Sequence, residues 1–120
     1  MTYAYLDNFL SKRDSRTVPS IRATYINRMA DGSITVQYHR TIVVRADKDG
    51  TFTLNSGGYR TATTKERIKA YSPAVLYQKA HRWYLAPRNQ DGTINWAKDA
   101  RVEFYDGMRI DAAGNVLPRE

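Results

Sequence analysis

The chain has no cysteine and only two histidines in 120 residues. Without cysteine, disulfides, thiolate metal sites and a cysteine nucleophile are excluded, and the composition suits a reducing cytoplasm. The two histidines, His39 and His81, lie far apart in the sequence and the acidic residues are scattered, so the sequence predicts no metal site. We expect a fold that depends on packing alone and carries no cofactor.

Long hydrophobic runs are also missing. No apolar stretch approaches the roughly 20 residues that a bilayer-spanning helix needs, and the N-terminal residues lack the basic start and apolar run of a signal peptide. With 42% hydrophobic residues in a chain of this length, one hydrophobic core is expected. These features predict a single cytoplasmic domain over residues 1–120, without a membrane partner.

Known catalytic motifs are scarce as well. Gly57 and Gly58 lack the G-x-x-x-x-G-K-[ST] spacing of a nucleotide-hydrolysing P-loop. Residues 39–41 have the H-x-T form of two-histidine phosphoesterases, but those enzymes need a second copy, and residues 81–83 lack the hydroxyl. Because no nucleophile, base and orienting group can be paired, the sequence predicts a binding protein without catalytic residues.

Positive charge, in contrast, is abundant. The formal net charge is +7, and arginine outnumbers lysine by 13 to 6. The planar guanidinium group suits phosphate and carboxylate, so this bias favours an anionic partner. Residues 60–88 hold seven basic residues and one acid, whereas residues 91–120 hold four basic and six acidic residues. The cationic region is therefore expected in the middle of the chain, where the same charges also suit a merely solvated surface.

Turn signals recur between segments in which apolar and polar residues alternate. Asp-Gly pairs suit tight hairpin turns, and alternation predicts strands on either side of them. The predicted strands cover residues 21–29, 33–46 with a bulge at Arg40, 51–54, 74–78, 82–86, and a last hairpin of 102–105 with 108–111. The sequence predicts a mainly β (α+β) fold, a small curled antiparallel sheet or barrel with an N-terminal helix and one short helix near residues 63–71.

The two chain ends are predicted to differ from the sheet. Leu6, Phe9 and Leu10 share one helical face, which predicts a helix from Tyr3 to Lys12 within a helical N-terminal arm of residues 1–17. Residues 112–120 are predicted to form a frayed tail.

Residues 54–72 combine a glycine turn with a short basic helix. Thr63 and Glu66 fit a capping box, which predicts the helix start, and Pro73 ends the helix soon afterwards. Lys65 and Lys69 are four residues apart and share one face of that helix. The free amides of the first turn, with a neighbouring arginine and threonine hydroxyls, form a candidate phosphate site. The alternative is a turn and a cap with only structural roles.

Aromatic side chains are interleaved with these cations. Exposed rings beside arginines can stack on nucleic-acid bases with little sequence preference. Trp83 and Tyr84 lie on opposite faces of a strand, so a one-sided sheet buries only one of them. The candidate residues for binding nucleic acid or phosphate are Tyr59, Arg60, Thr61, Thr63, Thr64, Lys65, Lys69, Arg82 and Trp83.

The segment N-S-G-G-Y-R-T-A-T-T-K-E-R-I at residues 55–68 resembles the pattern N-S-G-G-[YW]-R-T-x-T-T-K-x-R-I in small proteins of tailed bacteriophages. Residues 77–78, 83–84 and 104–108 extend the resemblance. It implies the cytoplasm of a bacterial host and a role in phage takeover or in defeating host defence. The resemblance supplies no catalytic residues.

Two functions are consistent with these observations. The first is a phage-type accessory protein that binds nucleic acid through a basic, aromatic-bearing surface. The alternative is an anti-defence or host-takeover inhibitor that uses the same cations on a host protein or on a small nucleotide signal. The sequence leaves the oligomeric state open.

Overall fold

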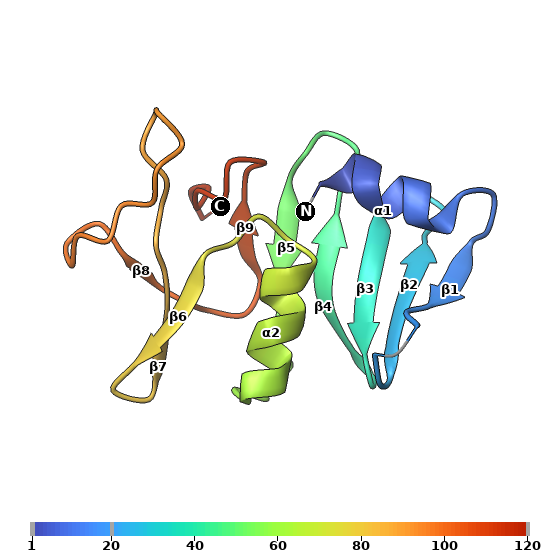
Figure 1. Cartoon of the computed structure of the whole chain (residues 1–120), viewed down its shortest axis with the longest axis horizontal. Coiled ribbons are helices and arrows are strands. Elements are labelled where there is room, and N and C mark those ends of the chain that lie inside the picture. The colour runs from blue at the N-terminus through green and yellow to red at the C-terminus, as the bar shows by residue number, and fades with distance from the viewer. Residues whose placement is uncertain (1, 20, 120) are drawn as a thin grey trace.

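The computed structural model describes residues 2–19 and 21–119, which form two antiparallel sheets and two α-helices (Figure 1). Met1, Ser20 and Glu120, which the predicted domain, arm and tail include, lie outside the described residues. The predicted mainly β (α+β) fold is confirmed. Of the two forms that the sequence allowed, the sheets take the open one, since the end strands of neither sheet pair with each other to close a barrel.

The larger sheet has six strands in the order β1-β2-β3-β4-β5-β9, and the smaller sheet has three in the order β6-β7-β8. Every neighbouring pair is antiparallel. The larger sheet contains β1 (Ser15–Thr17), β2 (Thr24–Arg28), β3 (Ile34–Tyr38), β4 (Thr41–Ala46), β5 (Phe52–Leu54) and β9 (Met108–Ile110). The smaller sheet contains β6 (Leu76–Lys79), β7 (Arg82–Leu85) and β8 (Val102–Glu103).

Three Asp-Gly pairs form turns of one design, which confirms their prediction as turns. In each, the aspartate side chain accepts a hydrogen bond from the backbone N–H two residues ahead, at 2.9–3.0 Å. The glycine that follows has a φ of +86° to +92°, which a side chain with a Cβ adopts only with strain. The residues concerned are Asp31 with Ser33, Asp49 with Thr51 and Asp91 with Thr93.

The predicted long strand 33–46 is instead a hairpin of β3 and β4. Tyr38 pairs with Thr41, so His39 and Arg40 form a two-residue turn, and His39 has the positive φ (+53°) that such turns require. The bulge predicted at Arg40 lies at Val43, since Val36 pairs with Val44 but Gln37 pairs with Ile42. The polar pair His39-Arg40 therefore marks a turn, which the alternation of apolar and polar residues on both sides made look like part of one strand.

The predicted final hairpin is wrong because its two strands belong to different sheets. Residues 102–103 form β8, which pairs with β7, whereas residues 108–110 form β9, which pairs with β5. The turn at Asp106-Gly107 carries the chain from one sheet to the other, and the Gly107 N–H donates to the Leu54 carbonyl over 2.8 Å. This segment joins the two sheets.

Both helices pack on the larger sheet through one continuous core. Helix α1 (Tyr3–Leu10) contributes Leu6 and Leu10, and helix α2 (Ala62–Ala70) contributes Ile68. These side chains are buried with the inward residues of β2 to β5. Burial of this apolar area is the main stabilising term of a domain of this size.

The chain ends follow the predictions only in part. The N-terminal helix is present but ends at Leu10, two residues early, and residues 15–17 of the predicted helical arm form strand β1. In the tail, the Leu117 N–H donates to the Arg109 carbonyl over 2.8 Å, and Val116 bridges to Ile110. Fraying of residues 112–120 stays a prediction.

Candidate functional site

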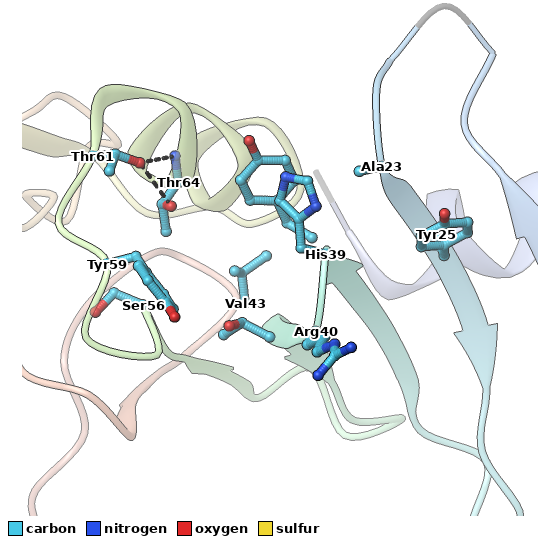
Figure 2. A pocket seen from close by; sticks show the side chains of 11 residues that line it. Ala23, Tyr25, His39, Arg40, Val43, Ser56, Tyr59, Thr61 and Thr64 are labelled. Atoms are coloured by element: carbon cyan, nitrogen blue, oxygen red, sulfur yellow. Dashed lines mark hydrogen bonds between the residues drawn. The ribbon is translucent and has the colours of Figure 1, made fainter.

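A pocket of about 620 Å³ lies where three chain segments meet: the start of β2, the β3–β4 turn and the loop from β5 to α2 (Figure 2). Its volume falls within the range typical of small-molecule sites, roughly 300–1,000 Å³. We call it the tyrosine pocket. It is lined by Ala23, Tyr25, Tyr38, His39, Arg40, Thr41, Val43, Ser56, Tyr59, Thr61 and Thr64.

Gly57 lets the β5–α2 loop lie against β4. Its φ is +64°, and a Cβ built there falls 2.5 Å from the Thr41 Oγ1 atom, closer than two such atoms can approach. The Gly57 N–H donates to the Asn55 side-chain oxygen over 2.7 Å. At Gly58, by contrast, no atom lies within 4 Å of such a Cβ. The first of the two predicted turn glycines is therefore the one that shapes the pocket wall.

Ser56 is fixed on the far side of this loop by Asp106. The Ser56 N–H and hydroxyl both donate to one Asp106 carboxylate oxygen, over 2.8 and 2.7 Å, and Ser56 is fully buried. Burial raises the pKa of Asp106, but these two hydrogen bonds and the nearby charge of Arg60 outweigh it, so the net pKa is lowered. The carboxylate thus holds the pocket loop to the turn that joins the two sheets.

Helix α2 begins at the pocket, two residues earlier than the capping box predicted. Thr61 is the N-cap, and its Oγ1 accepts a hydrogen bond from the Thr64 N–H over 3.2 Å. The two threonine hydroxyls also lie 3.0 Å apart and hydrogen-bond to each other, with Thr64 buried. Thr63 is an exposed residue inside the first turn. The predicted start at Thr63 and Glu66 is therefore wrong.

Three tyrosines and a histidine supply the aromatic walls of the pocket. The rings of Tyr38 and His39 are in contact, with centroids 4.4 Å apart. Tyr59, on the opposite wall, is 66% exposed, and its ring faces the pocket (Figure 2). Arg67 from α2 places its guanidinium 5.2 Å from the Tyr38 ring centroid and donates to the Thr24 hydroxyl over 3.0 Å. The Tyr38 wall is thereby braced by both the sheet and the helix.

The pocket lining carries positive but no negative charge. Arg40 lies in the exposed β3–β4 turn, and no carboxylate belongs to the lining. Within residues 2–19 and 21–119, no acidic side chain forms an ion pair with Arg40. An uncompensated guanidinium beside exposed rings is suited to an anionic, planar ligand.

The predicted binding residues are divided between this pocket and the smaller sheet. Tyr59, Thr61 and Thr64 line the pocket. Arg60 points away from it, with its guanidinium 5.2 Å and 4.7 Å from the ring centroids of Trp83 and Phe104.

The other predicted cations have partners of their own. Lys69 lies 3.5 Å from Glu66, and Arg82 lies 3.1 Å from Glu103. Lys65 reaches the Gln78 side-chain oxygen over 3.5 Å. These cations therefore do not converge on one binding site.

Trp83 is the member of the Trp83–Tyr84 pair that is buried. It is 2% exposed and packs on Phe104, with ring centroids 5.4 Å apart, whereas Tyr84 is half-buried on the other face of β7. The expectation that only one of the two rings enters the core is confirmed. Trp83 is a core residue, so of the two rings only Tyr84 is accessible from outside.

Sequence reasoning missed Tyr25, Tyr38, His39 and Arg40 as pocket residues. The segment Tyr-His-Arg was assigned to a continuous strand, in which these side chains would alternate between faces. Its turn brings them instead to the end of the sheet that faces the start of α2 (Figure 1). Reading His39-Arg40 as a turn between two apolar runs would have found Tyr38, His39 and Arg40, whereas no local pattern places Tyr25 beside them.

Residues 2–19 and 21–119 contain no cluster of three or more histidine, cysteine, aspartate or glutamate side chains that is arranged to hold a metal ion. Neither α1 nor α2, the helices in this part of the chain, has the length and apolar character needed to cross a bilayer.

Comparison with known proteins identifies the family of the chain. No curated protein and no solved structure matches it significantly. The sequence model of the Kyanoviridae Gp96 protein family matches residues 10–111, which include every residue of the tyrosine pocket and every predicted binding residue. This match supports the bacteriophage origin that the resemblance of residues 55–68 implied. The chain belongs to the Kyanoviridae Gp96 family and is a bacteriophage protein.

Proposed function

We propose that this phage accessory protein binds nucleic acid and holds an unpaired nucleotide in the tyrosine pocket. The observation that supports the proposal best is the composition of the pocket: three tyrosines and one arginine surround about 620 Å³ of space, and the lining contains no carboxylate. A nucleotide combines a flat aromatic base with an anionic phosphate. The pocket offers a complementary group for each part.

The base and the phosphate are assigned to different walls. The Tyr59 ring is the stacking surface, since it is exposed and faces the pocket (Figure 2). The Tyr38–His39 pair closes the opposite side. Arg40 contacts the phosphate, because it lies at the pocket edge and has no carboxylate partner among the described residues. Stacking of this kind contributes roughly 1–3 kcal/mol per base.

The cations outside the pocket have a more general role in this proposal. Lys65, Lys69 and Arg82 are members of the strongly basic segment 60–88. Their field attracts a polyanion without reading its sequence, and salt weakens that attraction. We therefore propose that these cations increase the affinity for nucleic acid at low salt, and that the pocket fixes the position of one nucleotide.

Fluorescence anisotropy with labelled dT12 and U12 oligonucleotides tests this proposal. Tyr59→Ala is expected to weaken binding about 10-fold, because it removes one stacked base worth roughly 1–3 kcal/mol. Arg40→Ala is expected to weaken binding and to lower the slope of log K against log salt by about 0.7, the value for one lost contact with a single-strand phosphate.

Matched controls come from helix α1 and the segment that follows it. Tyr5 is 57% exposed and Arg13 is exposed, and neither side chain lines the pocket. Tyr5→Ala and Arg13→Ala are expected to bind like the parent. If the pocket variants also bind like the parent at low and moderate salt, or if the parent binds neither oligonucleotide, nucleic-acid binding by this pocket is excluded.

One observation favours a second candidate, the capture of a small nucleotide signal in an anti-defence or host-takeover role. The pocket is concave, and residues of one chain line it. Its volume is in the range of small-molecule sites, so a free nucleotide that is not part of a polymer is a suitable ligand. Competition separates the two candidates. If free mononucleotides displace dT12 at concentrations near the Kd of dT12, capture of a small nucleotide is favoured. If only longer oligonucleotides compete with dT12, binding of a nucleic-acid polymer is favoured.

Binding to a host protein is the remaining form of this alternative. Arginine and tyrosine are also common in protein interfaces, where the cations would contact carboxylates. A pulldown from host cells with and without nuclease separates the forms, because a nucleic-acid complex is lost on nuclease treatment and a direct protein complex is retained.

A further inference from the structure

The outer face of the smaller sheet carries a second group of aromatic side chains, away from the tyrosine pocket. Tyr77 on β6 and Tyr84 on β7 are directly opposite each other, and their ring centroids lie 5.8 Å apart. Trp83 and Leu85, the neighbours of Tyr84 in β7, are buried on the inner face. Alternation along β7 therefore directs Tyr84 outward.

A tryptophan extends this outer surface. Trp96, from the long connection between β7 and β8, meets the Tyr77 ring edge-on with centroids 5.5 Å apart. It is 60% exposed, so most of its indole ring is accessible to a partner. Three rings thus lie in sequence, Trp96 on Tyr77 and Tyr77 on Tyr84. We call them, with the charged residues beside them, the aromatic face.

The charge beside these rings is mainly positive. Lys79 and Arg82 are paired across the β6–β7 hairpin, each two residues from a tyrosine and so on the same side of the sheet. Arg101 stacks on Tyr84, with its guanidinium carbon 4.0 Å from the ring centroid. Glu103, opposite Tyr84, is bound by Arg82 over 3.1 Å. Three cations against one carboxylate leave the aromatic face with a net positive charge.

We infer that the aromatic face is a second contact surface for single-stranded nucleic acid. One base stacks on the exposed Trp96 ring and the next contacts the half-buried Tyr77 and Tyr84 beside it, while Lys79 and Arg101 contact the phosphates. An exposed ring that continues into half-buried rings and is flanked by cations fits this polymer, since every base has an aromatic face and every linkage has a charge. The inference rests on the proposed function, because it extends one bound nucleotide to a longer strand.

Tryptophan fluorescence of the full chain tests the aromatic face separately from the pocket. The chain has two tryptophans, of which Trp83 is 2% and Trp96 is 60% exposed. Base stacking is expected to quench the emission of Trp96 when dT12 is added. In Trp96→Phe, the remaining emission comes from buried Trp83 and is expected to stay unchanged on the same titration.

Two further variants locate the contact. Tyr59→Ala lies in the pocket, so dT12 is expected to quench Trp96 in that variant too, at higher concentration. Lys79→Gln with Arg101→Gln is expected to lower the slope of log K against log salt by about 1.4, for two lost phosphate contacts. Lys12→Gln with Arg13→Gln, an exposed pair beyond α1, is the charge-matched control and should leave the slope unchanged.

The outcomes separate this inference from the proposed function. If dT12 binds by anisotropy and Trp96 emission does not change, the aromatic face is not a nucleic-acid surface, whereas the pocket proposal stands. If Trp96 is quenched and Tyr59→Ala binds like the parent, the aromatic face is supported and the pocket is not. If no oligonucleotide binds, both fail. Circular dichroism of each variant excludes loss of fold as the cause.

Discussion

At the scale of single residues, the start of α2 depends on which threonine hydroxyl reaches a free amide. Residues 61–66 contain two overlapping candidates, Thr61 with Thr64 and Thr63 with Glu66. The sequence favours the second, because glutamate completes a capping box. The structure uses the first, since Thr61 has the extended backbone of an N-cap (φ −93°, ψ 159°) and Thr64 is buried against the core. Burial, which local sequence does not reveal, decides between them.

This assignment predicts different costs for two similar substitutions. Thr61→Ala removes the acceptor for the Thr64 N–H and is expected to lower the free energy of unfolding by about 1 kcal/mol. Thr63→Ala removes an exposed hydroxyl from a helix interior and is expected to change it by less than about 0.5 kcal/mol. Urea denaturation followed by circular dichroism measures both. A larger loss for Thr63→Ala than for Thr61→Ala would contradict the assigned cap.

At the scale of elements, the loop before α2 and the turn before β9 are held together by one carboxylate. Asp106 accepts two hydrogen bonds from Ser56, and Arg60 lies 3.8 Å away while covering Trp83 and Phe104. This contact joins residues 50 positions apart in the sequence. Asp106-Gly107 was recognised as a turn from its composition, but its partner was not, because no local pattern specifies a contact of that range.

Removing this carboxylate is therefore expected to destabilise the protein. Asp106→Ala leaves the buried Ser56 N–H and hydroxyl without an acceptor and is expected to cost about 1–3 kcal/mol of unfolding free energy. Asp106→Asn keeps an acceptor oxygen and is expected to cost less. Thermal or urea denaturation at neutral pH measures both, and an unchanged stability of Asp106→Ala would refute the role of this contact.

The Asp106 carboxylate also makes the stability of the parent depend on pH in a way that Asp106→Asn does not share. The pKa of Asp106 is lowered in the folded protein, so the carboxylate stabilises the fold above its unfolded pKa of about 3.9 and loses this effect as the pH falls through the folded value. As the pH falls below about 5, Asp106→Asn is expected to lose less stability than the parent, because the variant has no carboxylate at this position to become protonated. Exposed Asp99→Asn is the control and should follow the parent. Asp31, Asp49 and Asp91 also have lowered pKa values, through hydrogen bonds within their turns, so some acid sensitivity persists in every variant.

Strand pairing shows the same division between local and distant information. Asp-Gly turns and alternation predicted most strands of the two sheets, because both signals are local. They predicted the strand at residues 108–110 but the wrong partner for it, since it pairs with β5 of the larger sheet, and they missed the turn at His39-Arg40 within residues 33–46. The pocket was missed for this second reason. Its Tyr59 and Thr61 wall was predicted, and the opposite wall depends on the turn.

At the scale of the whole molecule, the basic side chains that make up the net charge of +7 differ in whether a carboxylate lies beside them. Among the described residues, the basic side chains Arg60, Lys69 and Arg82 each have a carboxylate within 4 Å, whereas Arg40 in the pocket has none. The pocket belongs to the larger sheet and the aromatic face to the smaller one, in a molecule that measures 43 × 28 × 28 Å. If the same nucleic-acid molecule contacts both proposed surfaces, we expect the two contacts to strengthen each other, since the second contact forms at high effective concentration.

The claim that the tyrosine pocket holds a nucleotide is tested most directly by an amide chemical-shift titration of the full chain with dT12. We predict that the largest shifts fall on the β3–β4 turn and on the Gly57–Thr61 loop, and that Tyr59→Ala reduces them at the same oligonucleotide concentration. A titration in which dT12 binds but both segments keep their shifts would contradict the account.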